Sequence, residues 1–195
     1  MEPLSRYYLK DGAFHLKSKW PRRIRLCISA MFFIFSAIFV NQEAYTHPPT
    51  FAQVRQEQIN KVSAIGNVPK KEADQIVQAV YKWAKEFEVD KNLILAIIRV
   101  ESQFNKHAIS KSGAYGLMQV IPVWHKDKIL AARAKLGNPE LFNISTNVFL
   151  GTWVLKDCLV KYKGNVNSAL QCYSGQTPGY NEKVLVAYKD IKILS

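Results

Sequence analysis

Hydrophobic residues recur at helical spacing through most of the chain beyond residue 70. Positions three and four apart share one face of an α-helix, and this spacing joins Ile76 to Phe87 and Leu93 to Phe104. A long helix is expected from Ser145 or Thr146 to about Lys163. Strand-like alternation is nearly absent, so the predicted fold class is all-α. Shorter helices are expected over residues 117–124, where Pro122 bends or stops the helix, 166–173 and 180–193.

A different pattern marks the beginning of the chain, where residues 26–40 contain no charged side chain. A membrane-spanning helix needs about 17–25 apolar residues, and Ile24 and the stem of Arg25 extend the run to residues 24–40. Seven basic and two acidic residues lie within residues 1–25, which predicts a cytoplasmic tail over residues 1–23. We favour a retained signal anchor over a cleaved signal peptide, because no clear cleavage site follows; a buried globular helix is the third interpretation.

Residues 41–70 are polar and are interrupted by three prolines and a glycine. This composition predicts a linker with a short helix near residues 54–62. The remaining residues, 71–195, are expected to form one globular domain with its own core.

Composition narrows the chemistry of this domain. Three cysteines are too few for a four-cysteine zinc site, and the four histidines form no metal-binding pair, so neither a metal nor another cofactor is expected. The net charge of +12 suits an acidic polymer such as cell wall, anionic lipid or nucleic acid, or simply a solvated basic surface.

Glu101 is the residue whose position is unusual for its type. It lies four residues after Ile97 and three after Ile98, and therefore shares their apolar face near the predicted end of a helix. Burial and the helix dipole both disfavour the carboxylate there and raise its pKa. A carboxyl group that stays protonated near neutral pH is suited to general acid catalysis. The alternative is that the helix ends early and Glu101 faces water.

The stretch from Ile97 to Pro122 resembles the core of the soluble-lytic-transglycosylase (SLT) family of lytic transglycosylases, which have a lysozyme-like fold. The matching pieces are Glu101-Ser102, Ser110, Gly113-Ala114 and the four residues Gly116-Leu117-Met118-Gln119. Residues 169–175 and 180–189 are similar to the tyrosine-containing turn and the closing helix of that family, so the resemblance covers residues 72–192. Cys172, Ser174 and Ile121 depart from the family pattern.

The resemblance implies a peptidoglycan lytic transglycosylase in which Glu101 is the single acid–base catalyst. It would cut the bond between N-acetylmuramic acid and N-acetylglucosamine and form a 1,6-anhydro product. A lysozyme-type hydrolase and a weakly catalytic wall-binding subunit are the alternatives. The residues that the resemblance assigns to substrate binding are Ser110, Gln119, Tyr173, Tyr180, Ser102 and Gly116.

The anchor predicted over residues 24–40 and the resemblance together indicate a bacterial inner-membrane protein with a periplasmic catalytic domain, or a protein secreted to the periplasm if the signal is cleaved. Peptidoglycan strands are the partner that the resemblance implies. Nucleic acid is not expected as a partner because an exported chain has little access to it. A secretion or conjugation apparatus is a further candidate partner, which the sequence does not identify. Cys158 and Cys172 lie in consecutive predicted helices, where they form either a disulfide bridge or two buried thiols.

Overall fold

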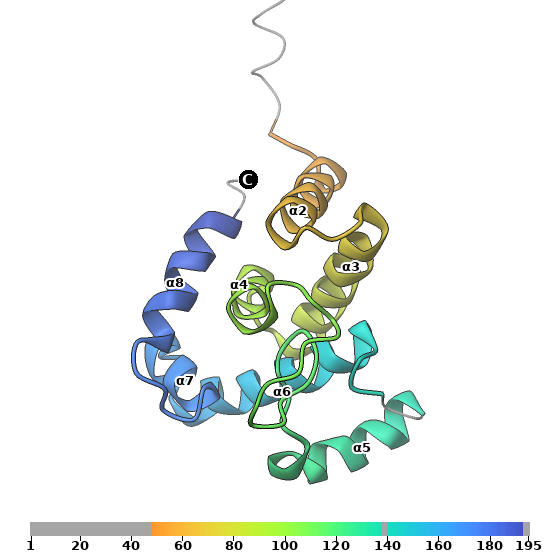
Figure 1. Ribbon diagram of the computed structural model, residues 1–195. Coiled ribbons are helices and arrows are strands. Elements are labelled where there is room, and N and C mark those ends of the chain that lie inside the picture. Colours follow the sequence, from red (N-terminus) through yellow and green to blue (C-terminus); the bar gives the residue numbers. More distant parts are fainter. Residues whose placement is uncertain (1–47, 138–139, 193–195) are drawn as a thin grey trace, which may run out of the picture. The chain divides into compact units, whose positions relative to one another are not determined.

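The computed structural model describes residues 48–137 and 140–192, and its regular structure there is helical (Figure 1). The predicted all-α class is confirmed for this part of the chain, which contains two isolated β-bridges at Tyr115 but no named strand. The predicted tail and anchor, residues 1–23 and 24–40, lie outside the described residues. None of the described helices is long and apolar enough to cross a membrane. The elements are α2 (Phe51–Gly66), α3 (Lys70–Phe87), α4 (Lys91–Ser102), the 3₁₀-helix η2 (Pro122–Trp124), α5 (Lys126–Leu136), α6 (Ile144–Lys161), α7 (Val166–Tyr173) and α8 (Tyr180–Ile191).

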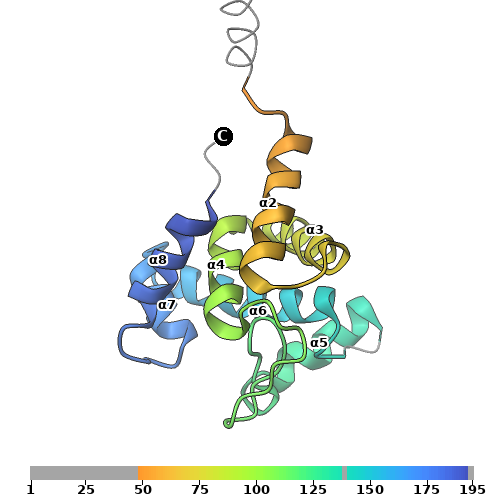
Figure 2. The ribbon, with the colours of Figure 1, turned by 45° about the horizontal axis from the view of Figure 1, so that its top comes forward.

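Helix α4 is the centre of the fold. Its six residues Leu93 to Ile98 are all buried, and α3 and α8 pack on opposite sides of it (Figures 1 and 2). A helix that is apolar around its whole circumference has to be enclosed by its neighbours. The Asp90 side chain caps its beginning by accepting a hydrogen bond from the Asn92 N–H. The last turn of α4 emerges from this core and carries Glu101.

Helix α2 occupies most of the segment that the sequence predicts to be a linker. Thr50 and Gln53 form a capping box at its start, and Ile59 and Val62 are buried against the core. The helix packs on α3 and touches α8. It is longer than the predicted short helix, because two apolar residues three positions apart are enough to attach an otherwise polar helix.

The loop between α4 and η2 is held against α6 by one buried amide. The Asn147 side chain accepts a hydrogen bond from the Met118 N–H at 2.7 Å and donates to the carbonyl oxygens of Tyr115 and Leu141, both at 2.8 Å. A Cβ atom on Gly116 would lie 2.3 Å from the Asn147 amide nitrogen, so only glycine fits this contact. The loop therefore has a defined path beside α4.

Two sequence expectations are corrected here, and one helix was not anticipated. The helix predicted over residues 117–124 is irregular except for the 3₁₀ turn at Pro122–Trp124, because Pro122 lacks the N–H that a longer helix needs. Helix α5 was not predicted, since only Ala132 on it is buried. Helix α6 is capped by Asn143 rather than by Ser145 or Thr146.

Cys158 and Cys172 form a disulfide bond that joins α6 to α7, with their Cα atoms 5.9 Å apart. Of the two alternatives from the sequence, the bridge is the one found. The bond attaches the end of α7 to α6 next to Tyr173, which follows Cys172 directly.

Candidate active site

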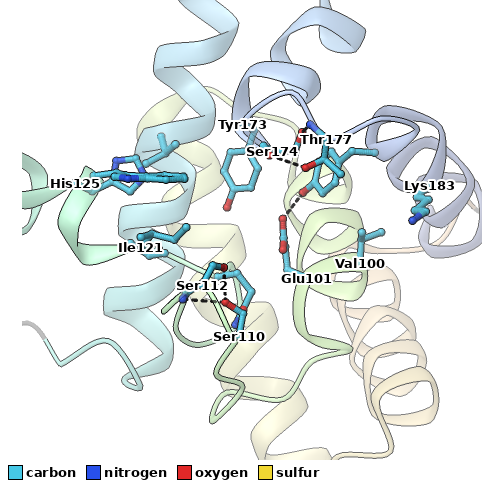
Figure 3. A pocket seen from close by; sticks show the side chains of 16 residues that line it. Val100, Glu101, Ser110, Ser112, Ile121, His125, Tyr173, Ser174, Thr177 and Lys183 are labelled. Atoms are coloured by element: carbon cyan, nitrogen blue, oxygen red, sulfur yellow. Dashed lines mark hydrogen bonds between the residues drawn. The ribbon is translucent and has the colours of Figure 1, made fainter.

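A cavity of about 320 Å³ opens beside the last turn of α4 (Figure 3). Its walls come from α4, from the loop before η2, from α6 and from the turn between α7 and α8. Segments far apart in the sequence thus meet at this cavity. Glu101 is the only acidic side chain among the described residues that line the cavity. Its other lining residues include Val100, Ser110, Ser112, Gln119, Ile121, Trp124, His125, Tyr173, Ser174, Thr177, Tyr180 and Lys183.

The Glu101 side chain points into this cavity and is held there by one tyrosine. The Tyr180 hydroxyl donates a hydrogen bond of 2.6 Å to Glu101 Oε1. Burial raises the pKa of Glu101, and the hydrogen bond from Tyr180, which favours the carboxylate, opposes that shift only in part. No cationic nitrogen of the described residues lies within 4.0 Å of the carboxyl oxygens. The group is therefore suited to hold a proton and to release it at the cavity surface.

Tyr173 and Tyr180 stack on each other in the cavity wall, with ring centroids 6.3 Å apart and an interplanar angle of 25°. The Tyr173 hydroxyl donates to the Met118 carbonyl oxygen at 2.7 Å, and not to Glu101. Burial raises the pKa of both phenols, so both stay neutral donors. Tyr173 thus links α7 to the loop, while Tyr180 is the one described residue whose side chain forms a hydrogen bond with the carboxyl group.

Ser110 and Gln119 line the cavity from the loop side. The Ser110 hydroxyl lies 2.9 Å from that of Ser112 and accepts a hydrogen bond from the Ala114 N–H at 3.0 Å. The Gln119 amide nitrogen donates to the Gly116 carbonyl oxygen at 2.9 Å. Neither side chain forms a hydrogen bond with Glu101, and both residues line the cavity.

Ser102 and Gly116 do not line the cavity, although the sequence places them with the substrate-binding residues. Ser102 Oγ lies within hydrogen-bond distance of the carbonyl oxygens of Ile98 and Leu117, at 3.0 and 2.9 Å. One residue further along a helix points about 100° away, so Ser102 cannot face the same way as Glu101. Both residues hold the loop in place.

Family comparison agrees with this geometry. Residues 78–190, more than half of the chain, match the family described as "Transglycosylase SLT domain". The chain belongs to this family. The matched region runs from α3 to α8 and includes the whole wall of the Glu101 cavity, so the SLT domain and the candidate site coincide.

Curated relatives extend the comparison. The membrane-bound lytic murein transglycosylases C of Yersinia pestis (strain Pestoides F) and Yersinia pseudotuberculosis serotype O:1b (strain IP 31758) are each 32% identical over 123 residues, 62% of this chain. The chain spans about a third of the length of these relatives, since the match covers 34% of each. The crystal structure of the 70 kDa soluble lytic transglycosylase from Escherichia coli aligns with a TM-score of 0.48 at 21% identity, covering 72% of this chain and 26% of that one.

Several residues of the SLT domain line the cavity without having been predicted from the sequence. Trp124, which is 68% exposed, lines the cavity together with His125, whose pKa is lowered by burial and by the nearby Lys128. Lys183 lies on the other side of Glu101 (Figure 3). Trp124 and His125 lie just after the SLT-like motif in the sequence. This position was the only sequence feature that could have indicated their place in the cavity wall. No sequence feature indicates Lys183, because its position in the helical pattern is that of any exposed lysine.

The described residues contain no group of three or more His, Cys, Asp or Glu side chains that could hold a metal ion. What the site offers instead is a desolvated carboxyl group, a neutral phenol bonded to it, and hydroxyl and amide groups on the opposite wall. This arrangement can transfer a proton to and from a bound neutral molecule.

Proposed function

We propose that this SLT-domain chain is a peptidoglycan lytic transglycosylase with Glu101 as its single acid–base catalyst. It cleaves the β-1,4 bond between N-acetylmuramic acid and N-acetylglucosamine and leaves a 1,6-anhydro ring on the muramyl residue. The observation that carries the proposal is the burial of Glu101 in a cavity where Tyr180 is its hydrogen-bond partner and no described carboxylate accompanies it. The lysozyme-like arrangement implied by the sequence resemblance belongs to this proposal.

In the first step, the protonated Glu101 carboxyl transfers its proton to the bridging oxygen as the C1–O bond breaks. Burial favours the neutral acid before the transfer, because a charged carboxylate is poorly solvated in the cavity. The Tyr180 hydroxyl then stabilises the carboxylate that forms, since a hydrogen bond to a charged acceptor is stronger than one to a neutral acceptor. The substrate's own N-acetyl group shields C1.

In the second step, the Glu101 carboxylate removes the proton from the muramyl 6-hydroxyl, and that oxygen attacks C1. A C1–O6 bond closes the anhydro ring, the proton returns to Glu101, and no water is consumed. The nucleophile is tethered to the reacting sugar, so proximity replaces a second catalytic group. Hydrolytic glycosidases commonly place two carboxyl groups about 5–9.5 Å apart, which the described lining of this cavity lacks.

The remaining lining residues are assigned to substrate binding. Ser110 and Gln119 line the cavity from the loop between α4 and η2 and present a hydroxyl and an amide, which are suited to N-acetyl and sugar hydroxyl groups. Tyr173 shapes the wall on the other side. Ser174 lines the cavity too, but its hydroxyl donates to the Gln171 carbonyl oxygen, so it serves mainly the turn.

We place this activity in the bacterial periplasm, with residues 24–40 as an inner-membrane anchor. The basic residues before this segment support the orientation, and the relatives described above are named as membrane-bound. Peptidoglycan strands are the proposed partner, and local opening of the wall for an envelope-spanning machine is the proposed use.

Mass spectrometry of the products tests the proposal. The full-length chain is incubated with purified peptidoglycan, and the released fragments are weighed. We expect fragments with an anhydro end, which are one water lighter than fragments with a reducing end. Reducing ends would assign a lysozyme-type hydrolase instead, and binding without released fragments would assign a wall-binding subunit.

A further inference from the structure

Helix α7 packs beside the first turn of α8, which carries Tyr180 (Figure 1). Tyr180 is the first residue of α8, and the preceding Gly179 provides no side-chain cap for the helix. Two contacts from α7 reach this turn. The ring of Tyr173 stacks on that of Tyr180, and the Gln171 amide nitrogen donates a hydrogen bond of 2.7 Å to the Asn181 side chain. The position of α7 therefore helps to set the position of the Tyr180 hydroxyl.

Helix α7 has little attachment to the core of its own. It is eight residues long and buries only Ala169 and Leu170. In the turn that follows it, residues 175–178 are all exposed. Isolated helices of this length are unstable in water, so the contacts at the ends of α7 matter for its placement. The Cys158–Cys172 bond is the covalent one, and it joins the last turn of α7 to the buried Cys158 of α6.

A continuous series of contacts leads from this bond to the carboxyl group of Glu101. Cys172 is followed by Tyr173, whose hydroxyl donates to the Met118 carbonyl oxygen at 2.7 Å and whose ring stacks on Tyr180. The Tyr180 hydroxyl in turn donates to Glu101 at 2.6 Å. A shift of α7 would pass along this series to the last hydrogen bond. Misplacing a catalytic group by about 1 Å can cost about a hundredfold in rate.

We propose that Cys158 and Cys172 are positioning residues for the reaction: their disulfide holds Tyr180 against Glu101, so the chain is fully active only when the bridge is formed. This inference rests on the proposed function, because it takes Glu101 as the acid. The bridge forms by thiol–disulfide exchange, in which a disulfide oxidant takes two electrons and two protons from the two thiols and becomes a dithiol. Disulfides persist in oxidising compartments and not in the cytosol, so the activity increases after export.

Reversible reduction tests the inference. The kcat and KM for the release of anhydro fragments are measured with the full-length chain when oxidised, after a dithiol reductant, and after reoxidation, with thiol labelling to confirm each state. Reduction should lower kcat about tenfold with little change in KM, and reoxidation should restore it. The double variant Cys158→Ser/Cys172→Ser should have the same low kcat and should not respond to the reductant. An unchanged kcat after reduction would overturn the inference.

Two variants separate positioning from a loss of stability. Tyr180→Phe lacks the hydrogen bond to Glu101, so opening the bridge in this variant should change kcat by less than about twofold. A tenfold loss in that background would show that the bridge acts by another route, and would overturn the inference. Val62→Ala removes buried apolar volume from α2, outside the cavity lining, and should keep kcat although it lowers stability. A comparable loss of kcat in Val62→Ala would likewise count against positioning.

The pKa of Glu101 tests the inference without relying on activity. If the oxidised wild type releases no fragments, the proposed function fails, and NMR of isotope-labelled glutamate carboxyl groups, assigned with Glu101→Gln, then decides. The redox state does not alter the identity of the other titratable side chains that line the cavity, which are His125, Tyr173, Tyr180 and Lys183. Opening the bridge should raise the pKa of Glu101, because the hydrogen bond from Tyr180 lowers it. An unchanged or lower pKa would overturn the inference.

Discussion

Two partly buried glutamates of this chain have opposite surroundings. Glu72 lies in the first turn of α3, has a side chain only 21% exposed, and pairs with Lys106 at 2.7 Å. Glu101 lies in the last turn of α4 and has a tyrosine hydroxyl as its partner. The helix dipole favours the Glu72 anion and disfavours the Glu101 anion. Burial alone thus does not make a proton donor; burial without a nearby cation does.

The cavities near Glu72 and Glu101 also differ in the charges of their linings. Lys106 lines a hollow of about 480 Å³ next to α3 and the start of α6, which is larger than the cavity at Glu101. None of its described lining residues is acidic, and the nearby Glu72 is paired with Lys106. A larger volume therefore does not mark the candidate active site; the presence of a carboxyl group in the lining does.

Glu101→Gln should have the largest effect. It keeps the shape of the side chain and an acceptor for Tyr180 but cannot donate or accept the catalytic proton, so the release of anhydro fragments should fall at least about a thousandfold. Mass spectrometry of the products measures the loss, and circular dichroism checks the fold. Glu72→Gln is the matched control and should keep most of the activity; a comparable loss there would remove the distinction between the two residues.

The disulfide supports the region of Glu101 and has no counterpart near Glu72 in the described chain. Replacing both Cys158 and Cys172 by Ser should lower the free energy of unfolding by about 3 kcal/mol, the value for a closed loop of about 15 residues. Urea unfolding measures this change. Cys27→Ser leaves the bridge intact and should be neutral, whereas reduction of the wild type should reproduce the double variant. Unchanged stability after reduction would mean that the bridge does not hold α7.

Tyr180→Phe should lower activity by about 10- to 100-fold, because it removes a hydrogen bond to a charged group. The same change should raise the pKa of Glu101 further, so the activity should persist to higher pH before the acid form is lost. The control is Tyr188→Phe, whose hydroxyl donates to Asp90 at the other end of α4, about 16 Å away along the helix. A pH profile unaltered by Tyr180→Phe would refute the role of this hydrogen bond.

Lys106→Gln tests the ion pair of Glu72, since it leaves this partly buried glutamate without its cation. We expect a loss of about 1 kcal/mol in the free energy of unfolding at neutral pH, measured by urea titration. Lys111→Gln, an exposed lysine outside any described ion pair, serves as the reference. Equal stability of the two variants at neutral pH would show that the Glu72–Lys106 pair contributes nothing.

The sequence predicted the parts of this molecule that are periodic and local. Helices α3 and α4 and the apolar face that carries Glu101 follow from residue spacing, because packing imposes that spacing. Helix α2 buries too few apolar residues for its sequence to show a clear helical period. The Tyr180–Glu101 hydrogen bond joins residues 79 positions apart, so no local pattern contains it. Ser102 was misplaced because adjacency in a motif does not mean adjacency in a site.

The stability of Glu101→Gln supplies the smallest and most discriminating effect. The pKa of Glu101 is raised by folding, so the charged form costs stability as pH rises from the unfolded value of about 4.3 through the raised pKa. Below pH 4 the wild type and Glu101→Gln should unfold alike, and at neutral pH the variant should be slightly more stable. Glu72→Gln should be less stable than the wild type at neutral pH, because it breaks an ion pair. If the two substitutions shift the urea midpoint in the same direction, the two glutamates do not differ as their surroundings indicate, and Glu101 lacks the destabilised carboxylate that the proposed acid requires.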